Sequence, residues 1–330
     1  MKKALITGAI GQDGCYLTEY LLKLGYGVYG LIRKPPYSNP WAIDWMMNKT
    51  CRDRVNYIYG DMRDELSLNN AIQKSWPDEI YNLAGQTFVP LSWDEPDATF
   101  DVNTGGLARV LKIVEQTKKD TKVYQASTSE MFGNHEGACT DETEMRPKSP
   151  YGVSKLAAHR LVALYRQRGL FVVGGILFNH ESPRRGTEMV TRKIAMAVAN
   201  WSAGGEDVLF LGNIDSRRDW GFAGEYVEAM HSMMQQTEPL DYVVGTGVSH
   251  SVRDFLEEAC LVAGVDSAFC ERHTRIDGQL KRKQEIFDLR ADTTKIRKQT
   301  GWTPKVDFRQ LVRMMVKAEQ VTLKAAEAAA

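Results

Sequence analysis

The chain has 330 residues, and its 42 Lys and Arg residues balance its 42 Asp and Glu residues. This balance excludes the strong overall field that draws nucleic acid or an anionic membrane to a protein, so partners have to bind at local sites. About two domains are expected at this length, at roughly 150 residues each. No stretch approaches the ~18 apolar residues of a membrane span, and glycines and Asp13 interrupt the opening residues too early for a signal peptide.

The cysteines indicate a reducing environment. Their number is odd, and they form neither a CxxC motif nor Cys/His pairs at the spacing of a zinc site. We therefore expect reduced thiols, a cytoplasmic location and no bound metal. The cysteines are Cys15, Cys51, Cys139, Cys260 and Cys270.

Short apolar runs alternate with longer segments of helical period through the first half of the chain. The segments at residues 16–24 and 105–118, for example, place apolar residues three and four apart, as an amphipathic helix does. This alternation predicts the α/β class, with a doubly wound parallel Rossmann sheet. The expected strands are residues 3–7, 27–33, 55–59, 79–83, 122–126 and 171–177.

The pattern changes beyond residue 178. No linker rich in Pro, Ser or Gly separates the two halves, so we expect a smaller C-terminal α/β domain that is interleaved with the first. Residues 1–178 and 221–246 are assigned to the Rossmann domain, and residues 179–220 and 247–330 to the smaller domain. The expected elements here are helices at 189–203 and 224–236 and strands at 208–211 and 241–245.

Three glycines follow the first expected strand at the spacing GxxGxxG, and a helix is expected to begin behind them. Gly8, Gly11 and Gly14 let backbone amides approach a pyrophosphate at the helix N-terminus, and the last glycine permits close packing of helix and sheet. The first interval is one residue longer than in the usual dinucleotide fingerprint, a variant typical of short-chain dehydrogenases. We therefore predict a dinucleotide site that includes the neighbouring Gln12 and Asp13.

The ends of the next strands carry further cofactor residues. Arg33 stands where NAD enzymes place an acidic residue on the ribose 2′-hydroxyl, so it predicts a 2′-phosphate and hence NADP. The alternative is an arginine that merely ends a strand at the surface. Asp61 is expected to bond the adenine amino group. The other predicted residues, after the third and fourth strands, are Met62, Leu83, Ala84 and Gln86.

A catalytic helix is expected to begin near residue 150. Ser149 is its predicted N-cap and Pro150 its first residue. Tyr151 and Lys155, four residues apart, then share one helix face. The ammonium group, together with an oxidised nicotinamide, is expected to lower the pKa of the phenol so that Tyr151 can act as a base.

Two more candidates follow the fifth expected strand. Thr128 has a hydroxyl that can bond the reacting oxygen of a substrate. Glu130 adds a carboxylate, the group that removal of a proton from carbon requires. The alternative for Glu130 is a solvated glutamate in a loop.

Several longer motifs together resemble the GDP-mannose 4,6-dehydratases. They are residues 124–133, SPYGVSK at 149–155, NHESPRRG at 179–186 with VTRK at 190–193, and residues 211–221, and the match continues to residues 301–304. The resemblance implies catalytic roles for Thr128, Glu130, Tyr151 and Lys155. It also implies that His180 and Arg185 contact NADP. The substrate residues that it implies are Thr128, Asn179, Lys193, Leu211, Asn213, Arg218, Arg282 and Glu285.

Residues 281–289 lack the proline and the aromatic residue of the family motif there, so the base and the sugar stay open. The reaction expected is conversion of GDP-mannose to GDP-4-keto-6-deoxymannose with loss of water. The alternatives are an epimerase, a 4-keto reductase, a 4,6-dehydratase for another nucleotide sugar, or a non-catalytic NADP-binding sensor. The resemblance further implies a homodimer built on residues 105–118 and 151–168, or a tetramer in which residues 181–186 reach a neighbour.

Overall fold

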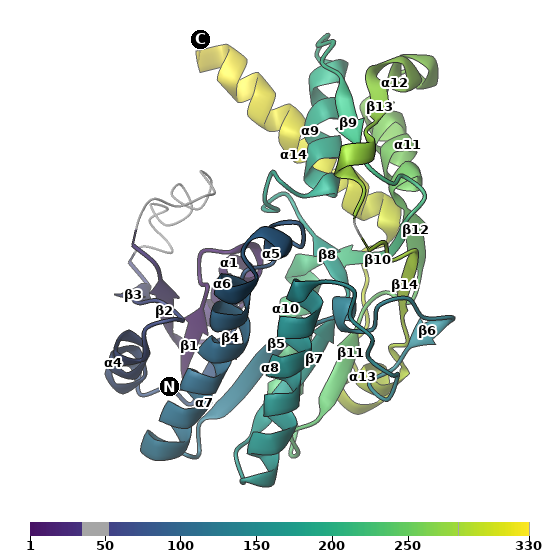
Figure 1. Cartoon of the computed structure of the whole chain (residues 1–330). Coiled ribbons are helices and arrows are strands. Elements are labelled where there is room, and N and C mark those ends of the chain that lie inside the picture. Colours follow the sequence, from purple (N-terminus) through teal and green to yellow (C-terminus); the bar gives the residue numbers. More distant parts are fainter. Residues whose placement is uncertain (35–52, 283, 330) are drawn as a thin grey trace.

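A seven-stranded parallel sheet forms the centre of the molecule (Figure 1). The computed structural model describes residues 1–34, 53–282 and 284–329. The α/β Rossmann fold expected from the sequence is confirmed. From edge to edge the strands are β11 (Asp241–Val244), β7 (Val172–Leu177), β5 (Lys122–Thr128), β4 (Glu79–Asn82), β1 (Lys3–Thr7), β2 (Gly27–Ile32) and β3 (Val55–Tyr59).

The sheet runs outward in both directions from β1 and β4. From β1 the chain continues to β2 and β3 on one side, and from β4 it continues to β5, β7 and β11 on the other. The carboxyl ends of all these strands lie at one edge, because every pairing is parallel. A crevice forms at such a reversal of strand order, which is where open α/β sheets bind their ligands.

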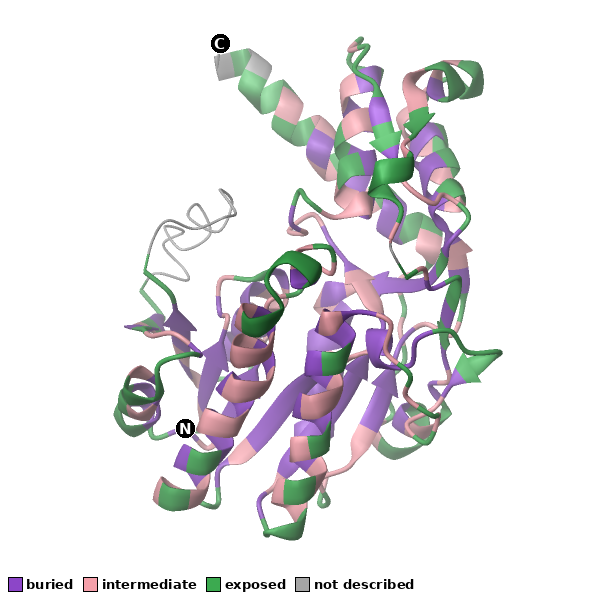
Figure 2. Cartoon of the chain, in the orientation of Figure 1, coloured by how far each residue is buried: buried purple, intermediate pink, exposed green. Residues whose placement is uncertain are grey.

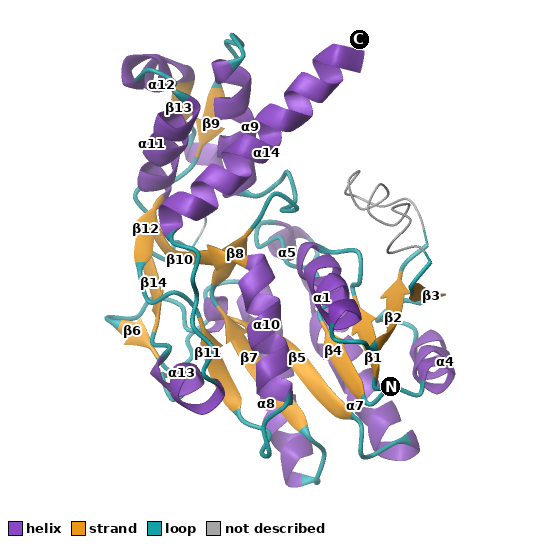
Figure 3. Cartoon of the chain, turned by 180° about the vertical axis from the view of Figure 1, so that it is seen from behind, coloured by secondary structure: helices purple, strands orange, loops and turns teal. Residues whose placement is uncertain are grey.

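Helices cover both faces of the sheet (Figures 1 and 3). On one face lie α1 (Gln12–Lys23), α10 (Ala223–Met234) and α13 (Thr294–Thr300), and on the other α4 (Glu65–Ser75), α7 (Gly106–Thr117) and α8 (Pro150–Gln167). Strand side chains alternate between the two faces of the sheet, which together form the first core: Ala4 and Ile6 pack with α1 and α10, whereas Leu5 packs with α4 and α7. Burial on both faces accounts for the nearly continuous apolar runs of these strands (Figure 2).

A second hydrophobic core lies beyond the carboxyl edge of the sheet. Ile194, Phe255 and Val312, one from each of three helices, are fully buried in it. Because they share this core, four of the helices beyond residue 189 pack with one another rather than on the central sheet. The elements are α9 (Val190–Ser202), α11 (Val252–Ala263), α12 (Ser267–His273) and α14 (Phe308–Ala329), with the paired strands β9 (Leu209–Leu211) and β13 (Thr274–Ile276).

A small sheet joins the two cores, and most of it was not expected from the sequence. Its central strand, β10, carries the buried Arg218 and Asp219, so apolar periodicity did not reveal it. In order its strands are β12 (Ser249–Ser251), β10 (Arg217–Phe222), β14 (Asp288–Ala291) and β6 (Ala138–Cys139), and β8 (Asn179–Glu181) pairs with β10. The remaining short helices are α5 (Leu91–Asp94), α6 (Pro96–Phe100), the π-helix η1 (Asp101–Gly105) and the 3-10 turns η2 (Ser129–Met131) and η3 (Gly278–Leu280).

The described residues hold four cysteines, all buried and none in a disulfide, and Cys51 lies outside those residues. Among the described helices, none combines the length and the apolar content that crossing a membrane requires. The same residues contain no cluster of three or more His, Cys, Asp or Glu that could hold a metal ion.

Asp219 ties the small sheet to the loop after β11. Its carboxylate accepts hydrogen bonds from the amides of Thr246, Gly247 and Ala291, at 2.8, 2.8 and 3.1 Å, and from the Thr246 hydroxyl at 2.6 Å. The residue is fully buried, so water cannot replace the carboxylate as the acceptor for these donors.

We expect Asp219→Ala to lower the free energy of unfolding by about 3 kcal/mol or more, because each buried donor left without a partner costs about 1–3 kcal/mol. Urea unfolding followed by circular dichroism measures this loss. Asp215→Ala is the control, since its exposed ion pair with Arg253 is worth less than about 1 kcal/mol. Equal stability of the two variants would contradict the role given to Asp219.

Candidate active site

A cleft of about 350 Å³ opens at the carboxyl edge of the central sheet and extends to the second core. Both walls carry residues predicted from the sequence, although they are far apart in the chain. The predicted residues that line it are Asp13, Leu83, Thr128, Glu130, Tyr151, Lys155, Asn179, His180, Arg185, Lys193, Leu211, Asn213, Arg218, Arg282 and Glu285.

The other predicted cofactor residues follow the strands β1 to β4 along the same edge. Gly8, Gly11, Gln12 and Gly14 come after β1, Arg33 after β2, Asp61 and Met62 after β3, and Ala84 and Gln86 after β4. Parallel strands bring these positions into one row, which can follow an extended dinucleotide across the sheet.

The turn after β1 has room for glycine alone at two positions. Gly8 has φ of +70°, and a Cβ there would lie 3.0 Å from the backbone of Ala84. A Cβ on Gly14 would lie 2.3 Å from the carbonyl oxygen of Gly8. Gly11 caps α1 without a side-chain hydrogen bond, so the first amides of the helix are available to an anion. These features fit the pyrophosphate of a dinucleotide.

Thr7 joins this turn to the end of β4. Its hydroxyl donates to Asn82 Oδ1 at 2.8 Å and accepts from the amides of Leu83 and Ala84, both at 3.1 Å. Asn82 in turn donates to Gln125 Oε1 on β5 at 2.6 Å. The ends of three neighbouring strands are therefore held together by buried side chains.

The catalytic helix α8 begins where the sequence predicted. The Ser149 hydroxyl accepts from the amide of Gly152 at 3.1 Å, and Pro150 is the first helical residue. Tyr151 and Lys155 are both buried and face the cleft. Burial raises the pKa of Tyr151 to about 12, and a hydrogen bond with Thr128 opposes this rise. The expected lowering of this pKa includes the charge of an oxidised nicotinamide; among the protein's own groups, loss of hydration outweighs the favourable contacts.

Lys155 is held close to the end of β5. Its Nζ donates to the carbonyl oxygen of Ala126 at 3.0 Å. Burial lowers the pKa of Lys155 to about 8, against the attraction of Asp13. The ammonium group is therefore mostly charged at neutral pH and loses its proton in mildly alkaline solution.

His180 and Asp13 form an ion pair in the cleft, with 12% and 21% of their side chains exposed. Nδ1 of His180 lies 2.7 Å from the carbonyl oxygen of Phe178, and Nε2 lies 2.8 Å from Asp13 Oδ2. Both neighbours are acceptors, so both ring nitrogens have to donate and the ring is an imidazolium. Burial lowers the pKa of His180, but the contacts with Asp13 and Phe178 raise it further, and the net direction is upward.

Glu130 has a partner that the sequence did not predict. Its Oε1 lies 2.9 Å from Nη1 of Arg282, a residue that the family resemblance assigns to the substrate. Thr128 stands two residues before it in the same turn, where its hydroxyl accepts from the Glu130 amide at 3.3 Å. Arg218 is buried in the same region and donates to the carbonyl oxygen of Ile286 at 2.9 Å.

Asp61 also has a charged partner close by. Arg63 grips both of its carboxylate oxygens, at 3.1 and 3.0 Å. These bonds, with a smaller contribution from Arg33, hold the pKa of Asp61 below its usual value. Arg33 and Arg63 thus place two cations near the ends of β2 and β3, and sequence reasoning had singled out only the first.

Asn103 is a second residue that sequence reasoning missed. Its side chain accepts from the Gln86 amide at 2.9 Å and donates to Gln86 O and Ser154 Oγ at 3.1 and 3.0 Å. It lies in the π-helix η1, a wide turn that often occurs at functional sites. The Gln86 side chain bonds Phe88 and Thr99, so both the backbone and the amide group of this residue have partners within the fold.

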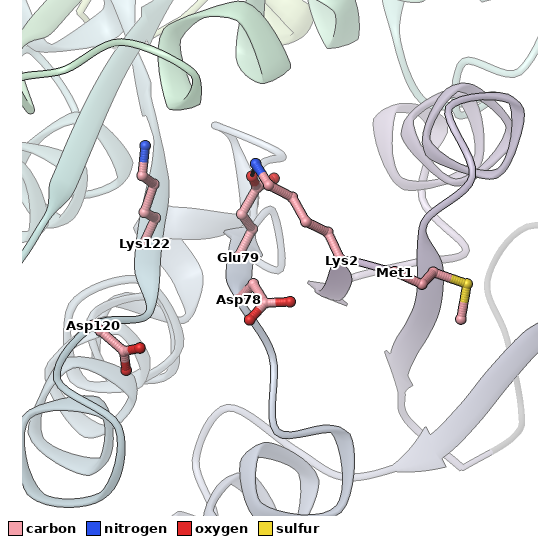
Figure 4. Close-up of a pocket in the computed structure, with 6 residues that line it drawn as sticks. All are labelled: Met1, Lys2, Asp78, Glu79, Asp120 and Lys122. Atoms are coloured by element: carbon pink, nitrogen blue, oxygen red, sulfur yellow. Dashed lines mark hydrogen bonds and ion pairs between the residues drawn. The ribbon is translucent and has the colours of Figure 1, made fainter.

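A second hollow lies at the opposite, amino-terminal end of the strands (Figure 4). Its most buried residue is Glu79, whose carboxylate accepts from Lys2 Nζ at 3.1 Å, Tyr26 Oη at 3.2 Å and Tyr81 Oη at 2.8 Å. These bonds satisfy the carboxylate within the fold, so we regard Glu79 as a structural residue.

Comparison with known proteins agrees with this geometry. The family model described as GDP-mannose 4,6 dehydratase matches residues 5–315. The chain belongs to the GDP-mannose 4,6-dehydratase family. GDP-mannose 4,6 dehydratase 1 of Arabidopsis thaliana is 44% identical over 323 residues, covering 96% of this chain and 89% of the relative. The human GDP-mannose 4,6 dehydratase is 41% identical over 337 residues, covering 96% and 91%.

Among solved structures, UDP-glucose 4-epimerase of Thermus thermophilus in complex with NAD is similar to the chain, with a TM-score of 0.83 and 25% identity. The similarity covers 96% of this chain and 99% of that one. The dehydratase family therefore shares its fold with epimerases, and the fold alone does not separate the two activities.

The His180–Asp13 ion pair predicts a pH range over which the pair stabilises the folded protein. The raised pKa of His180 gives stability that is complete below the unfolded value of about 6.5 and is lost as the pH rises through the folded value. Burial raises the pKa of Asp13, but His180, Gln12 and Arg185 together lower it more, so Asp13 gives stability that is lost as the pH falls below about 3.9. His180→Gln should therefore lower the free energy of unfolding most between about pH 4.5 and 6.5, by on the order of 2 kcal/mol.

Thermal unfolding of both proteins across this pH range measures the difference. The penalty should shrink as the pH rises above neutrality. His135→Gln, at an exposed histidine, is the control and should show no such window. A penalty for His180→Gln that is constant from pH 5 to pH 9 would rule out the ion pair.

Proposed function

We propose that this chain converts GDP-mannose to GDP-4-keto-6-deoxymannose with loss of water. The observation that carries the proposal is the buried carboxylate of Glu130, which lines the same cleft as Thr128, Tyr151 and Lys155. Oxidation of a sugar hydroxyl needs the last three residues, but elimination of water needs a further base that becomes an acid. The relatives named GDP-mannose 4,6 dehydratase support the substrate.

We further propose NADP as the cofactor. The glycine turn after β1 fits a pyrophosphate, and Arg33 and Arg63 fit a 2′-phosphate near the ends of β2 and β3. The similar epimerase structure holds NAD, the related dinucleotide. When bound, the nicotinamide supplies the hydride acceptor and donor of the reaction. His180, Arg185 and Lys155 would lie on the side of the cleft that holds it.

The chain's own residues then move protons. Tyr151 takes the proton of the sugar 4-hydroxyl once the positive charges of Lys155 and of a bound oxidised nicotinamide offset the rise in its pKa that burial causes. Thr128 donates a hydrogen bond to O4. Once C4 is a ketone, the hydrogen on C5 becomes acidic, and Glu130 removes it. Glu130 then gives its proton to the C6 hydroxyl, which leaves as water. The roles proposed for Asn179, Lys193, Leu211, Asn213, Arg218 and Glu285 are to line the substrate's part of the cleft.

The two cores support the division of the chain that the sequence predicted. We propose that residues 1–178 and 221–246 bind the dinucleotide and that residues 179–220 and 247–330 bind the sugar nucleotide. We also propose a homodimer or tetramer. The outer face of α8 leaves Val153 and Leu164 42% and 53% exposed, and a second copy would cover them. Arg184 pairs with Glu19 of its own chain at 2.8 Å, so any contact of residues 181–186 with a neighbour would compete with that bond.

Glu130→Gln tests the dehydratase assignment. The amide keeps the shape of the side chain but cannot accept the C5 proton, so elimination should slow by about 100-fold or more. Mass spectrometry of the reaction mixture should then detect a 4-keto sugar nucleotide that retains its C6 hydroxyl. In heavy water, exchange of the C5 hydrogen should be lost.

Tyr151→Phe is the matched comparison, because it removes the first proton acceptor and should prevent formation of any 4-keto sugar. Turnover of GDP-mannose by Glu130→Gln at the normal rate would mean that the chain is not a dehydratase of this kind. Parallel incubation with UDP-, dTDP- and CDP-hexoses identifies a different base or sugar.

Arg33→Asp tests the cofactor. Loss of a charge-assisted phosphate contact costs about 1.5–3 kcal/mol, so NADP should bind roughly tenfold to over a hundredfold more weakly, while NAD binding changes little. Fluorescence titration with both dinucleotides gives the ratio. Lys34→Asp changes the charge at the next exposed residue and should have a much smaller effect. Equal affinity of the unmodified protein for NAD and NADP would overturn the proposal.

A further inference from the structure

Arg282 and Glu130 meet across the cleft although 152 residues separate them in the chain. Only 10% of the Glu130 side chain and 33% of the Arg282 side chain are exposed, and Nη1 donates to Oε1 at 2.9 Å. A charged hydrogen bond that is mostly shielded from water is stronger than a surface ion pair. The contact therefore affects how readily Glu130 can accept a proton.

The segment that carries Arg282 is anchored at both sides of the residue. On one side Gly212 approaches so closely that a Cβ there would lie 2.6 Å from the Leu280 carbonyl oxygen. On the other, the Asn134 side chain bonds Glu285 O at 2.8 Å and the Phe287 amide at 2.9 Å. Leu280 and Glu285 are held by these contacts, so a change of partner by Arg282 can come from its long side chain.

A second guanidinium lies near the first. Arg218 is buried, and the positive charge of Arg282 is among the causes that lower the pKa of Arg218, after burial itself. Two like charges in a shielded site repel each other unless anions lie between or beside them. Glu130 supplies one such anion, and a diphosphate, with two charges and several acceptor oxygens, would suit the two guanidinium groups better.

The contact also conflicts with the chemistry proposed for Glu130. A carboxylate takes a proton from carbon through an oxygen lone pair, and Arg282 donates to one of the two oxygens. The other oxygen stays open, but the hydrogen bond stabilises the negative charge of the carboxylate, so Glu130 becomes a stronger base once that donor has another acceptor.

We propose that Arg282 exchanges partners, leaving Glu130 for the diphosphate of the incoming nucleotide sugar and thereby releasing the base once substrate is bound. The inference rests on the function proposed above, and it makes Arg282 a positioning residue for Glu130 as well as a phosphate ligand. Sugars without a diphosphate would leave the pair closed. No covalent step is involved, because one charged hydrogen bond replaces another.

The exchange predicts a competition that binding can measure without turnover. If Glu130 has to give up Arg282 when a diphosphate binds, then Glu130→Gln should bind GDP more tightly than the unmodified protein. A charge-assisted hydrogen bond is worth roughly tenfold or more in affinity. Isothermal titration with GDP, in the presence of saturating cofactor, gives the dissociation constants.

Two controls separate this effect from a general loss of negative charge. Glu188→Gln removes a carboxylate from the same cleft without touching the pair, and GDP affinity should change by less than about twofold, as for an exposed charge. In an Arg282→Met background, Glu130→Gln should tighten GDP binding much less than it does when Arg282 is present.

The exchange is wrong if Glu130→Gln leaves GDP affinity unchanged or weakens it, or if the gain is the same with and without Arg282. These outcomes do not depend on whether GDP-mannose is turned over. If Glu130→Gln tightens GDP binding but the unmodified protein makes no keto sugar, the exchange stands and the proposed function is refuted. If keto sugar forms but GDP affinity does not change, the function stands and the exchange is refuted.

Discussion

A series of buried hydrogen bonds crosses the carboxyl edge of the central sheet, and both the glycine turn after β1 and Lys155 depend on it. It runs from Thr7 through Asn82 to Gln125, whose amide donates to the Ala126 carbonyl oxygen at 2.8 Å. The same oxygen accepts from Lys155 at 3.0 Å. A buried polar group without a partner costs free energy. These hydrogen bonds therefore hold the ends of three parallel strands and helix α8 in fixed positions relative to one another.

The cleft above this edge contains charges that water would normally stabilise. The protein replaces water with opposite charges: His180 faces Asp13, Arg185 lies 3.1 Å from Glu181, and Arg282 meets Glu130. One of these pairs includes Glu130, the base of the proposed reaction. Removing one partner would leave an uncompensated charge, so stability and activity are linked at the same side chains.

The small sheet explains how the second wall of the cleft is held in place. Strand β10 pairs with β12 and β14 through its first residues and with β8 through its last, and Asp219 bonds the loop after β11. Its neighbour Arg218 faces the cleft from this strand. A single strand therefore carries both a structural carboxylate and a guanidinium suited to an anion, which is why its sequence is polar despite its burial.

The sequence by itself determined the Rossmann sheet, the glycine turn and the spacing of Tyr151 and Lys155, because these follow from local periodicity and from contacts within one helix or turn. It also predicted that Thr128 and Glu130 lie at the carboxyl end of the fifth strand, where Thr128 is the last residue of β5 and Glu130 lies in η2. Local patterns did not determine β10, whose buried Arg218 and Asp219 read as exposed residues. Nor did they determine the pairing of Glu130 with Arg282 or of His180 with Asp13, since 152 and 167 residues separate these partners. Only the folded chain brings such distant charges within hydrogen-bonding distance, and their effect depends on burial that no local pattern records.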